Sequence, residues 1–223
     1  MIVANRKPFD EIMEMLKPYT KILLIGCNEC VTVCSVGGAK EVEVLASEIR
    51  LARGKEGIPV EIKEHTLERQ CDPEYVEQIK PFIDQYEVVI SIACGCGVQS
   101  VADMYKKTYV VPGVNTTFMG SSEEQGVWKE MCQGCGNCVL DKTLGLCPVA
   151  RCAKSLFNGP CGGSQVGGSC EINKDVPCVW QLIVQKMKDM NMLDKYMEIQ
   201  PMKNWSTARD GGPRKRVRED LKI

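Results

Sequence analysis

Residues 21–30 read KILLIGCNEC, a continuous apolar run that ends at Gly26 and leads into two cysteines. Apolar runs without polar alternation are typical of parallel strands that are buried on both faces. The neighbouring sequence alternates between helical spacing (Pro8–Leu16, Gly38–Ala52, Pro73–Gln85 and Val98–Tyr105) and strand patterns (Ile58–Lys63, Glu87–Ile92 and Thr108–Val111). This alternation predicts a parallel sheet with right-handed crossovers.

We therefore expect an α/β fold, with an N-terminal parallel-sheet domain of the Rossmann or flavodoxin type over residues 1–118. The polar segment Gly113–Gly126 is typical of a linker. Residues 119–208 predict a small, loop-rich, cysteine-rich metal-cluster domain. Helical spacing over Pro177–Met192 places one apolar stripe on a helix near its end: Trp180, Ile183, Val184 and Met187. Residues 209–223 predict an extended polar tail.

The composition contains 14 cysteines in 223 residues, with 28 basic and 29 acidic side chains. Balanced charge gives no field that would recruit nucleic acid or an anionic membrane. The sequence shows no apolar window of membrane-spanning length and no signal peptide, so we expect a cytoplasmic protein. Because cytoplasmic thiols are kept reduced, the cysteines predict metal binding rather than a disulfide scaffold.

Six cysteines lie in the first domain: Cys27, Cys30, Cys34, Cys71, Cys94 and Cys96. Several follow predicted parallel strands, whose carboxyl ends share one edge of the sheet. We expect a metal site, with zinc or a further cluster, formed by Cys27, Cys30, Cys71 and either Cys94 or Cys96. Two alternatives stay open, namely buried structural cysteines and a redox pair of Cys27 and Cys30.

The other eight cysteines follow within a short Gly-rich segment: Cys132, Cys135, Cys138, Cys147, Cys152, Cys161, Cys170 and Cys178. The CxxCxxC spacing of the first three is typical of ligands to a [4Fe–4S] cluster, and Gly134 and Gly136 permit unusual φ values there. Eight thiolates match two such clusters. Grouping by sequence and interleaving are both open, and zinc is the competing metal.

Residues for other chemistry are scarce. His65 is the sole histidine, so no Ser–His–Asp set can form, and a structural role for it is favoured over ligation. Gly26–Gly38 matches neither common phosphate-loop pattern. We therefore expect a chain without a catalytic residue set of its own.

Three motifs resemble one known family: NGPCGG at 158–163, GSCE at 168–171 and Cys178-Val-Trp180, downstream of CxxCxxC. The resemblance is to the methylenetetrahydrofolate reductase C-terminal family, the cysteine-rich small subunit of the reductase of acetogenic and related anaerobic bacteria. It covers about residues 120–205; GCNEC and CGCG extend it less specifically.

The resemblance implies an iron–sulfur electron-transfer subunit in one-carbon metabolism. Its partner would be a flavin-bearing (β/α)8 subunit that reduces methylenetetrahydrofolate to methyltetrahydrofolate, with ferredoxin or another flavoprotein as a further electron donor. Family members are also described as zinc-binding. Two other hypotheses stay open, namely a zinc-stabilised scaffold of the same complex and a free-standing thiol oxidoreductase.

Overall fold

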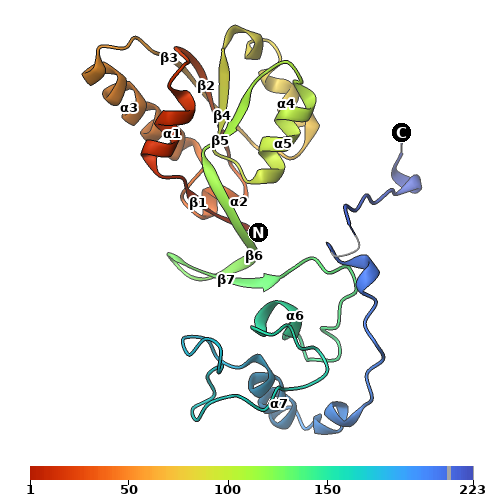
Figure 1. Cartoon of the computed structure of the whole chain (residues 1–223). Coiled ribbons are helices and arrows are strands. Elements are labelled where there is room, and N and C mark those ends of the chain that lie inside the picture. The colour runs from red at the N-terminus through yellow and green to blue at the C-terminus, as the bar shows by residue number, and fades with distance from the viewer. Residues whose placement is uncertain (210–211, 223) are drawn as a thin grey trace. The chain divides into compact units, whose positions relative to one another are not determined.

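The computed structural model describes residues 1–209 and 212–222, and it divides into two compact units, Met1–Trp128 and Lys129–Ile223. The first unit is a mixed α/β structure with a four-stranded sheet and with β1 and β6 of a three-stranded sheet, whose last strand continues past Trp128 (Figure 1). The expected α/β class is thereby confirmed. Of the tail expected over residues 209–223, Asp210, Gly211 and Ile223 lie outside the described residues.

The four-stranded sheet is parallel and has the order β3-β2-β4-β5. Its strands are β2 (Lys21–Cys27), β3 (Glu61–Leu67), β4 (Val88–Ser91) and β5 (Val110–Pro112). Counted along the chain, these four strands have the order 2-1-3-4, which begins the doubly wound flavodoxin-like order. From β2 the chain crosses to β3 on one side of β2, and then returns to β4 on the other side of β2. The point where ligands bind in such sheets therefore lies between β2 and β4.

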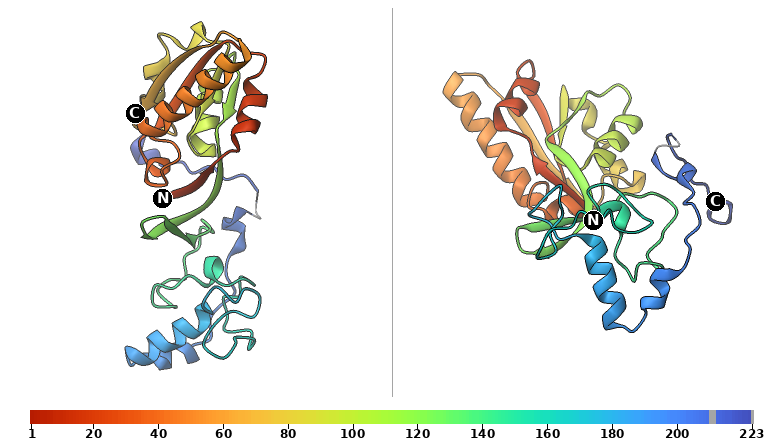
Figure 2. Two further views of the ribbon diagram at one scale, coloured as in Figure 1. Left: turned by 90° about the vertical axis from the view of Figure 1, so that its left-hand side faces the viewer. Right: turned by 60° about the horizontal axis from the view of Figure 1, so that its bottom comes forward.

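Side chains of β2 alternate between two apolar cores, which explains its uninterrupted apolar run. Ile22 and Leu24 pack with α1 (Phe9–Leu16) and α3 (Ala39–Glu56). Leu23 and Ile25 pack with α4 (Pro73–Val76) and α5 (Gly95–Met104) on the opposite face. Figures 1 and 2 show these helices on both sides of the sheet. The sheet is thus a rigid platform whose carboxyl edge carries the loops.

The three-stranded sheet replaces the linker that the sequence predicts at Gly113–Gly126. It has the order β1-β6-β7, with β1 at Ile2–Arg6, β6 at Val114–Glu124 and β7 at Val127–Cys132. The expectation of a linker is wrong because β6 pairs antiparallel with β1, which lies at the other end of this unit's sequence. Ala4 and Val114 pack in the first apolar core, whereas most residues of β6 are exposed, which is why its sequence is polar along most of its length.

Two predicted helices differ in extent. The segment predicted as one helix over Pro73–Gln85 forms α4 followed by two 3-10 turns, Glu77–Ile79 and Ile83–Gln85. Pro81 lies between the turns, where it lacks an amide hydrogen and interrupts helical hydrogen bonding. By contrast, α5 begins earlier than predicted, with Cys94 as its N-cap residue.

The second unit is mostly irregular. It contains the short helix α6 (Pro148–Arg151) and the longer helix α7 (Val179–Asp189), together with 3-10 turns at Leu193–Met197, Trp205–Thr207 and Glu219–Leu221. Another short helix, α2 (Cys30–Val33), belongs to the first unit. The buried residues of α7 are Val179, Trp180, Ile183 and Met187, so three of the four residues of the predicted stripe are buried and Val184 is only partly so. No helix in the described part of the chain is both long and apolar enough to cross a bilayer.

Candidate metal centres

Five cysteines of the first unit lie at the carboxyl edge of the parallel sheet. Cys27 ends β2 and Cys30 begins α2, while Cys71 lies between β3 and α4. Cys94 caps α5 and Cys96 lies in its first turn. Cys27 is buried and Cys71 and Cys96 are exposed, so the group extends from the interior to the surface.

The pKa values of three of these thiols are raised. Burial raises the pKa of the Cys27 thiol, and the neighbouring Cys94 and Cys30 raise it further. Burial likewise raises the pKa values of Cys71 and Cys96, with additional contributions from other members of the group. Thiolates gathered this closely repel one another unless a cation compensates them.

Cys34, the sixth cysteine of this unit, points elsewhere. Its buried thiol donates to the carbonyl oxygen of Ile2 in β1 at 3.8 Å. It therefore links α2 to the antiparallel sheet and has a structural role.

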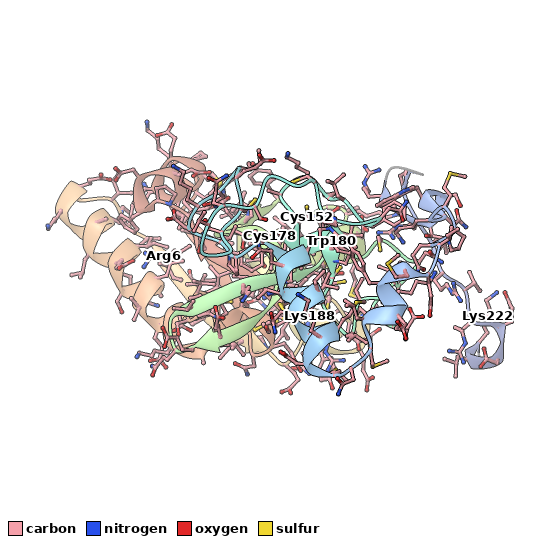
Figure 3. The ribbon with its side chains drawn as sticks, turned by 90° about the horizontal axis from the view of Figure 1, so that it is seen from below. Arg6, Cys152, Cys178, Trp180, Lys188 and Lys222 are labelled. Carbon is pink, nitrogen blue, oxygen red and sulfur yellow. The ribbon has the colours of Figure 1, made fainter. Side chains whose placement is uncertain are left out.

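Four cysteines of the second unit surround one small hollow of about 20 Å³. They come from well-separated positions in the sequence: Cys152, Cys161, Cys170 and Cys178. Trp180 closes one side, and its indole N–H donates to the carbonyl of Leu156 at 2.8 Å. Figure 3 labels Cys152, Cys178 and Trp180, which lie together near the start of α7.

A short antiparallel pairing brings Cys170 and Cys178 to this hollow. The Cys170 amide donates to the carbonyl of Val176 at 2.9 Å, and the Cys178 amide donates to that of Gly168 at 2.7 Å. Ser169 and Pro177 form a β-bridge between these bonds. The Cys161-Gly162-Gly163 segment adds Cys161, and Cys152 follows directly after α6.

Backbone amides donate to several of these sulfurs. The Gly163 amide donates to Cys161 Sγ at 3.4 Å, and the Gly134 amide to Cys132 Sγ at 3.3 Å. Amides of Asn173 and Ile172 lower the pKa of the Cys170 thiol because they stabilise the thiolate. Amide-to-sulfur hydrogen bonds of this kind suit thiolate ligands, whose charge they partly neutralise.

An ion pair lies at the rim of the hollow. Lys154 Nζ donates to a carboxylate oxygen of Glu171, and this contact is the main reason that the pKa of Glu171 is lowered. Cys161 Sγ donates to the same carboxylate at 3.3 Å. Because Glu171 neutralises Lys154, the pair adds no net charge beside the thiols.

The CxxCxxC loop of Cys132, Cys135 and Cys138 is held by residues from the C-terminal part of the unit. Thr207 Oγ1 donates to the Cys135 carbonyl at 2.9 Å, and Arg214 donates to the Gly134 carbonyl at 2.5 Å. Lys203 Nζ donates to the Asn137 carbonyl. Gly134 and Gly136 have φ values of 61° and 79°, the left-handed conformation that their sequence positions suggested.

The eight thiols are not all gathered. Cys147, the N-cap residue of α6, is not among the residues that line the hollow. Within residues 1–209 and 212–222, no three Cys, His, Asp or Glu side chains are close enough to hold a single metal ion. Most of the cysteines thus fall into three groups: those at the edge of the parallel sheet, those around the hollow and those of the CxxCxxC loop.

Three contributors were not predicted from the sequence: Gln70, the Lys154–Glu171 pair and the segment around Thr207. No sequence motif marks them, because each acts by contacting residues that are distant in the sequence. Arg214, in the segment predicted as an extended polar tail, contributes one such contact. His65 packs edge-on against Phe82, with ring centroids 5.4 Å apart, which agrees with a structural role.

These features define a two-unit α/β chain whose cysteines gather at loop edges and around a hollow. Residues 111–206 match a family model described as the C-terminal part of methylene-tetrahydrofolate reductase. That segment contains all eight cysteines from Cys132 to Cys178, and it excludes the six of the parallel sheet. A search of curated proteins finds no significant match to the chain.

Proposed function

We propose that this chain is the iron–sulfur electron-transfer subunit of a methylenetetrahydrofolate reductase. It would pass electrons to or from a flavin-bearing (β/α)8 subunit that reduces methylenetetrahydrofolate to methyltetrahydrofolate in one-carbon metabolism of the Wood–Ljungdahl type. The observation that supports this most is the gathering of Cys152, Cys161, Cys170 and Cys178 within the segment that matches the reductase family. The reducing cytoplasm of an anaerobe is the environment that such thiolate sites need.

In this proposal the eight cysteines bind two [4Fe–4S] clusters. Cys152, Cys161, Cys170 and Cys178 hold one of them. Cys132, Cys135 and Cys138 provide three thiolates for the other, and Cys147 provides the fourth. When bound, these clusters supply reversible one-electron transfer.

The chain's own residues set how readily the clusters accept electrons. Amide donors to cluster thiolates and nearby positive charge stabilise the reduced, more negative state. Gly134 and Gly163 supply amide donors, and Lys203 and Arg214 supply charge. These residues favour an electron carrier over an inert structural site.

Reduction of the folate itself belongs to the flavin of the partner subunit, because hydride chemistry is a property of that cofactor. The sequence offers no acid–base pair or nucleotide loop beside the thiols. The chain is therefore proposed as a non-catalytic subunit of an oxidoreductase. Ferredoxin or a nicotinamide-oxidising flavoprotein is the proposed source of electrons.

A zinc-stabilised scaffold of the same complex is the second candidate. Four cysteines line the hollow, and four thiolates are also the ligand set of structural zinc sites. A free thiol oxidoreductase is less favoured, because burial raises the pKa of Cys27 and so lowers its thiolate fraction at neutral pH.

Anaerobic purification of the full chain with its flavoprotein partner tests the proposal. We expect iron and sulfide in the purified complex and EPR signals after dithionite reduction. Cys170→Ser should remove one cluster and slow flavin reduction by the physiological donor, whereas Cys34→Ser should change neither. Stoichiometric zinc with no iron would overturn the electron-transfer role and support the scaffold.

A further inference from the structure

We propose that the first unit binds an iron–sulfur cluster of its own at the carboxyl edge of the parallel sheet. Its ligands are the thiolates of Cys27, Cys30 and Cys71 and one thiolate of the Cys94-Gly95-Cys96 pair. This site lies outside the segment that matches the reductase family, which begins at residue 111. The inference is therefore independent of the proposed function.

The location is the first argument. Strand order β3-β2-β4-β5 makes β2 and β4 the strands between which the chain changes direction. Loops beyond the carboxyl ends of such strands diverge and leave a crevice for a ligand. Cys27 ends β2 and Cys94 follows β4, so the two thiols flank this point.

A buried glutamine fixes the three cysteine loops relative to one another. Gln70, directly before Cys71, is fully buried and donates from Nε2 to the Gly26 carbonyl at 2.7 Å. Its Oε1 accepts from Ser91 Oγ at 2.7 Å, and this hydroxyl also accepts from the Ala93 amide at 3.3 Å. Gly26 precedes Cys27, and Ala93 precedes Cys94. One side chain thus joins the residues that precede three of the ligands.

The start of α5 packs closely on the same glutamine. A Cβ atom on Gly97 would lie 2.8 Å from Gln70 Cβ and 2.9 Å from Ala93 Cβ. The glycine after Cys96 therefore permits the helix to approach the Cys71 loop. The Gly95 amide donates to Thr116 Oγ1 at 2.8 Å, which fixes the turn between Cys94 and Cys96. The backbone around the thiols is preorganised without any disulfide.

The number of thiols is the next argument. Five cysteines lie on the loops at this edge of the sheet: Cys27, Cys30, Cys71, Cys94 and Cys96. Four cysteine thiolates are the usual ligand set of a [4Fe–4S] cluster.

An iron–sulfur cluster and tetrahedral zinc both take four thiolates, so iron and zinc analysis of the purified chain distinguishes them. On ligation each thiol loses its proton, and the irons compensate the repulsion between the thiolates.

Iron analysis of full-length variants tests the site, with protein purified anaerobically and folding checked by circular dichroism. Cys71→Ser changes an exposed residue, so it should not disturb folding, and Cys27→Ser and the double variant Cys94→Ser/Cys96→Ser extend the test. Each should lower iron by about two to four atoms per chain, with a matching loss of sulfide. Cys34→Ser changes a buried cysteine of the same unit that is not one of the five at the sheet edge, so this variant should keep the full iron content.

Unchanged iron in all three variants, or loss of zinc in place of iron, would overturn this inference. The variant with Cys132, Cys135 and Cys138 all replaced by serine separates it from the proposed function. If that variant loses iron while the first-unit variants do not, the proposed function survives and the first-unit cluster fails. If only the first-unit variants lose iron, the first-unit cluster survives and the clusters of the second unit fail.

Discussion

Gly136 occupies a conformation and a space that only glycine fits. Its φ is 79°, and an added Cβ would lie 2.6 Å from the Thr207 carbonyl oxygen and 2.8 Å from Thr207 Cβ. Alanine therefore meets both left-handed strain, roughly 1–2 kcal/mol, and a steric clash with backbone. We expect Gly136→Ala to displace the CxxCxxC loop from Thr207 and to lower the iron content and thermal stability of the full chain.

Gly145→Ala is the matched control, because Gly145 has a φ of 86° and nothing within 4 Å of an added Cβ. It carries the strain without the clash, so we expect full iron content and a loss of only about 1 kcal/mol in the free energy of unfolding. Equal iron loss in both variants would show that contact with Thr207 does not support the loop.

His65 offers a direct electrostatic measurement, because it is the sole histidine of the chain. Burial lowers its pKa, and the nearby Lys63 lowers it further. The unfolded state therefore binds the proton at a higher pH than the folded state does. The stability that depends on neutral His65 is complete above the unfolded pKa, about 6.5, and declines as the pH falls through that value toward the folded pKa.

The single imidazole resonance in NMR spectra should titrate with a midpoint below 6.5. His65→Phe should remove this part of the acid sensitivity of unfolding, since phenylalanine can keep the edge-on contact with Phe82. A midpoint at or above 6.5 would contradict the environment described for this side chain.

At the scale of elements, α7 is the main packed element of the second unit. Ile183 is fully buried, and its core partners include Leu144, Leu146 and Tyr196 from irregular segments. Ile183→Ala should cost about 2–5 kcal/mol through lost burial and a cavity. We expect a lower denaturant midpoint for the second unit, and faster loss of its iron to chelators.

Lys186→Ala lies on the exposed side of the same helix, so it should change the unfolding free energy by less than about 0.5 kcal/mol. The contrast isolates burial from helix propensity, because both variants place alanine in the helix interior. Comparable destabilisation by the two would indicate that α7 does not pack as described.

Elements with a strong local signal could be predicted, and elements made by distant partners could not. The runs of β2 and the stripe of α7 are local patterns, and both formed where expected. β1 and β6 are stabilised by pairing across most of the first unit, so the polar sequence of β6 alone suggested a linker. The helical spacing over Pro73–Gln85 predicts one helix, but Pro81 interrupts the helical hydrogen bonding within it.

The candidate sites show the same division. Parallel topology correctly indicated that cysteines after different strands share one edge, because strand ends align in a parallel sheet. Spacing alone left the grouping of the eight later cysteines open. The hollow around Cys152, Cys161, Cys170 and Cys178 depends on the pairing of Ser169 with Pro177, and no local sequence motif predicts this pairing.

At the scale of the whole molecule, the two units differ in what stabilises them. The first has two apolar cores on opposite faces of its parallel sheet. The second has one small cluster of buried residues: Val179, Trp180, Ile183 and Met187. Chain segments with so little buried apolar area usually need metals or cross-links to stay folded. Under the proposed function, the clusters therefore supply much of the folding free energy of the second unit.

Removal of the clusters from the full chain, by oxidation in the presence of a chelator, should thus unfold the units unequally. Hydrogen exchange followed by mass spectrometry should show lost amide protection across residues 133–178 and in α7. Amides of β2 and β4 should stay protected, since their strands are buried on both faces whether or not the first-unit cluster is present. If protection in α7 survives complete loss of metal, packing alone holds that unit, and the thiolates would be free to serve redox chemistry without a structural role.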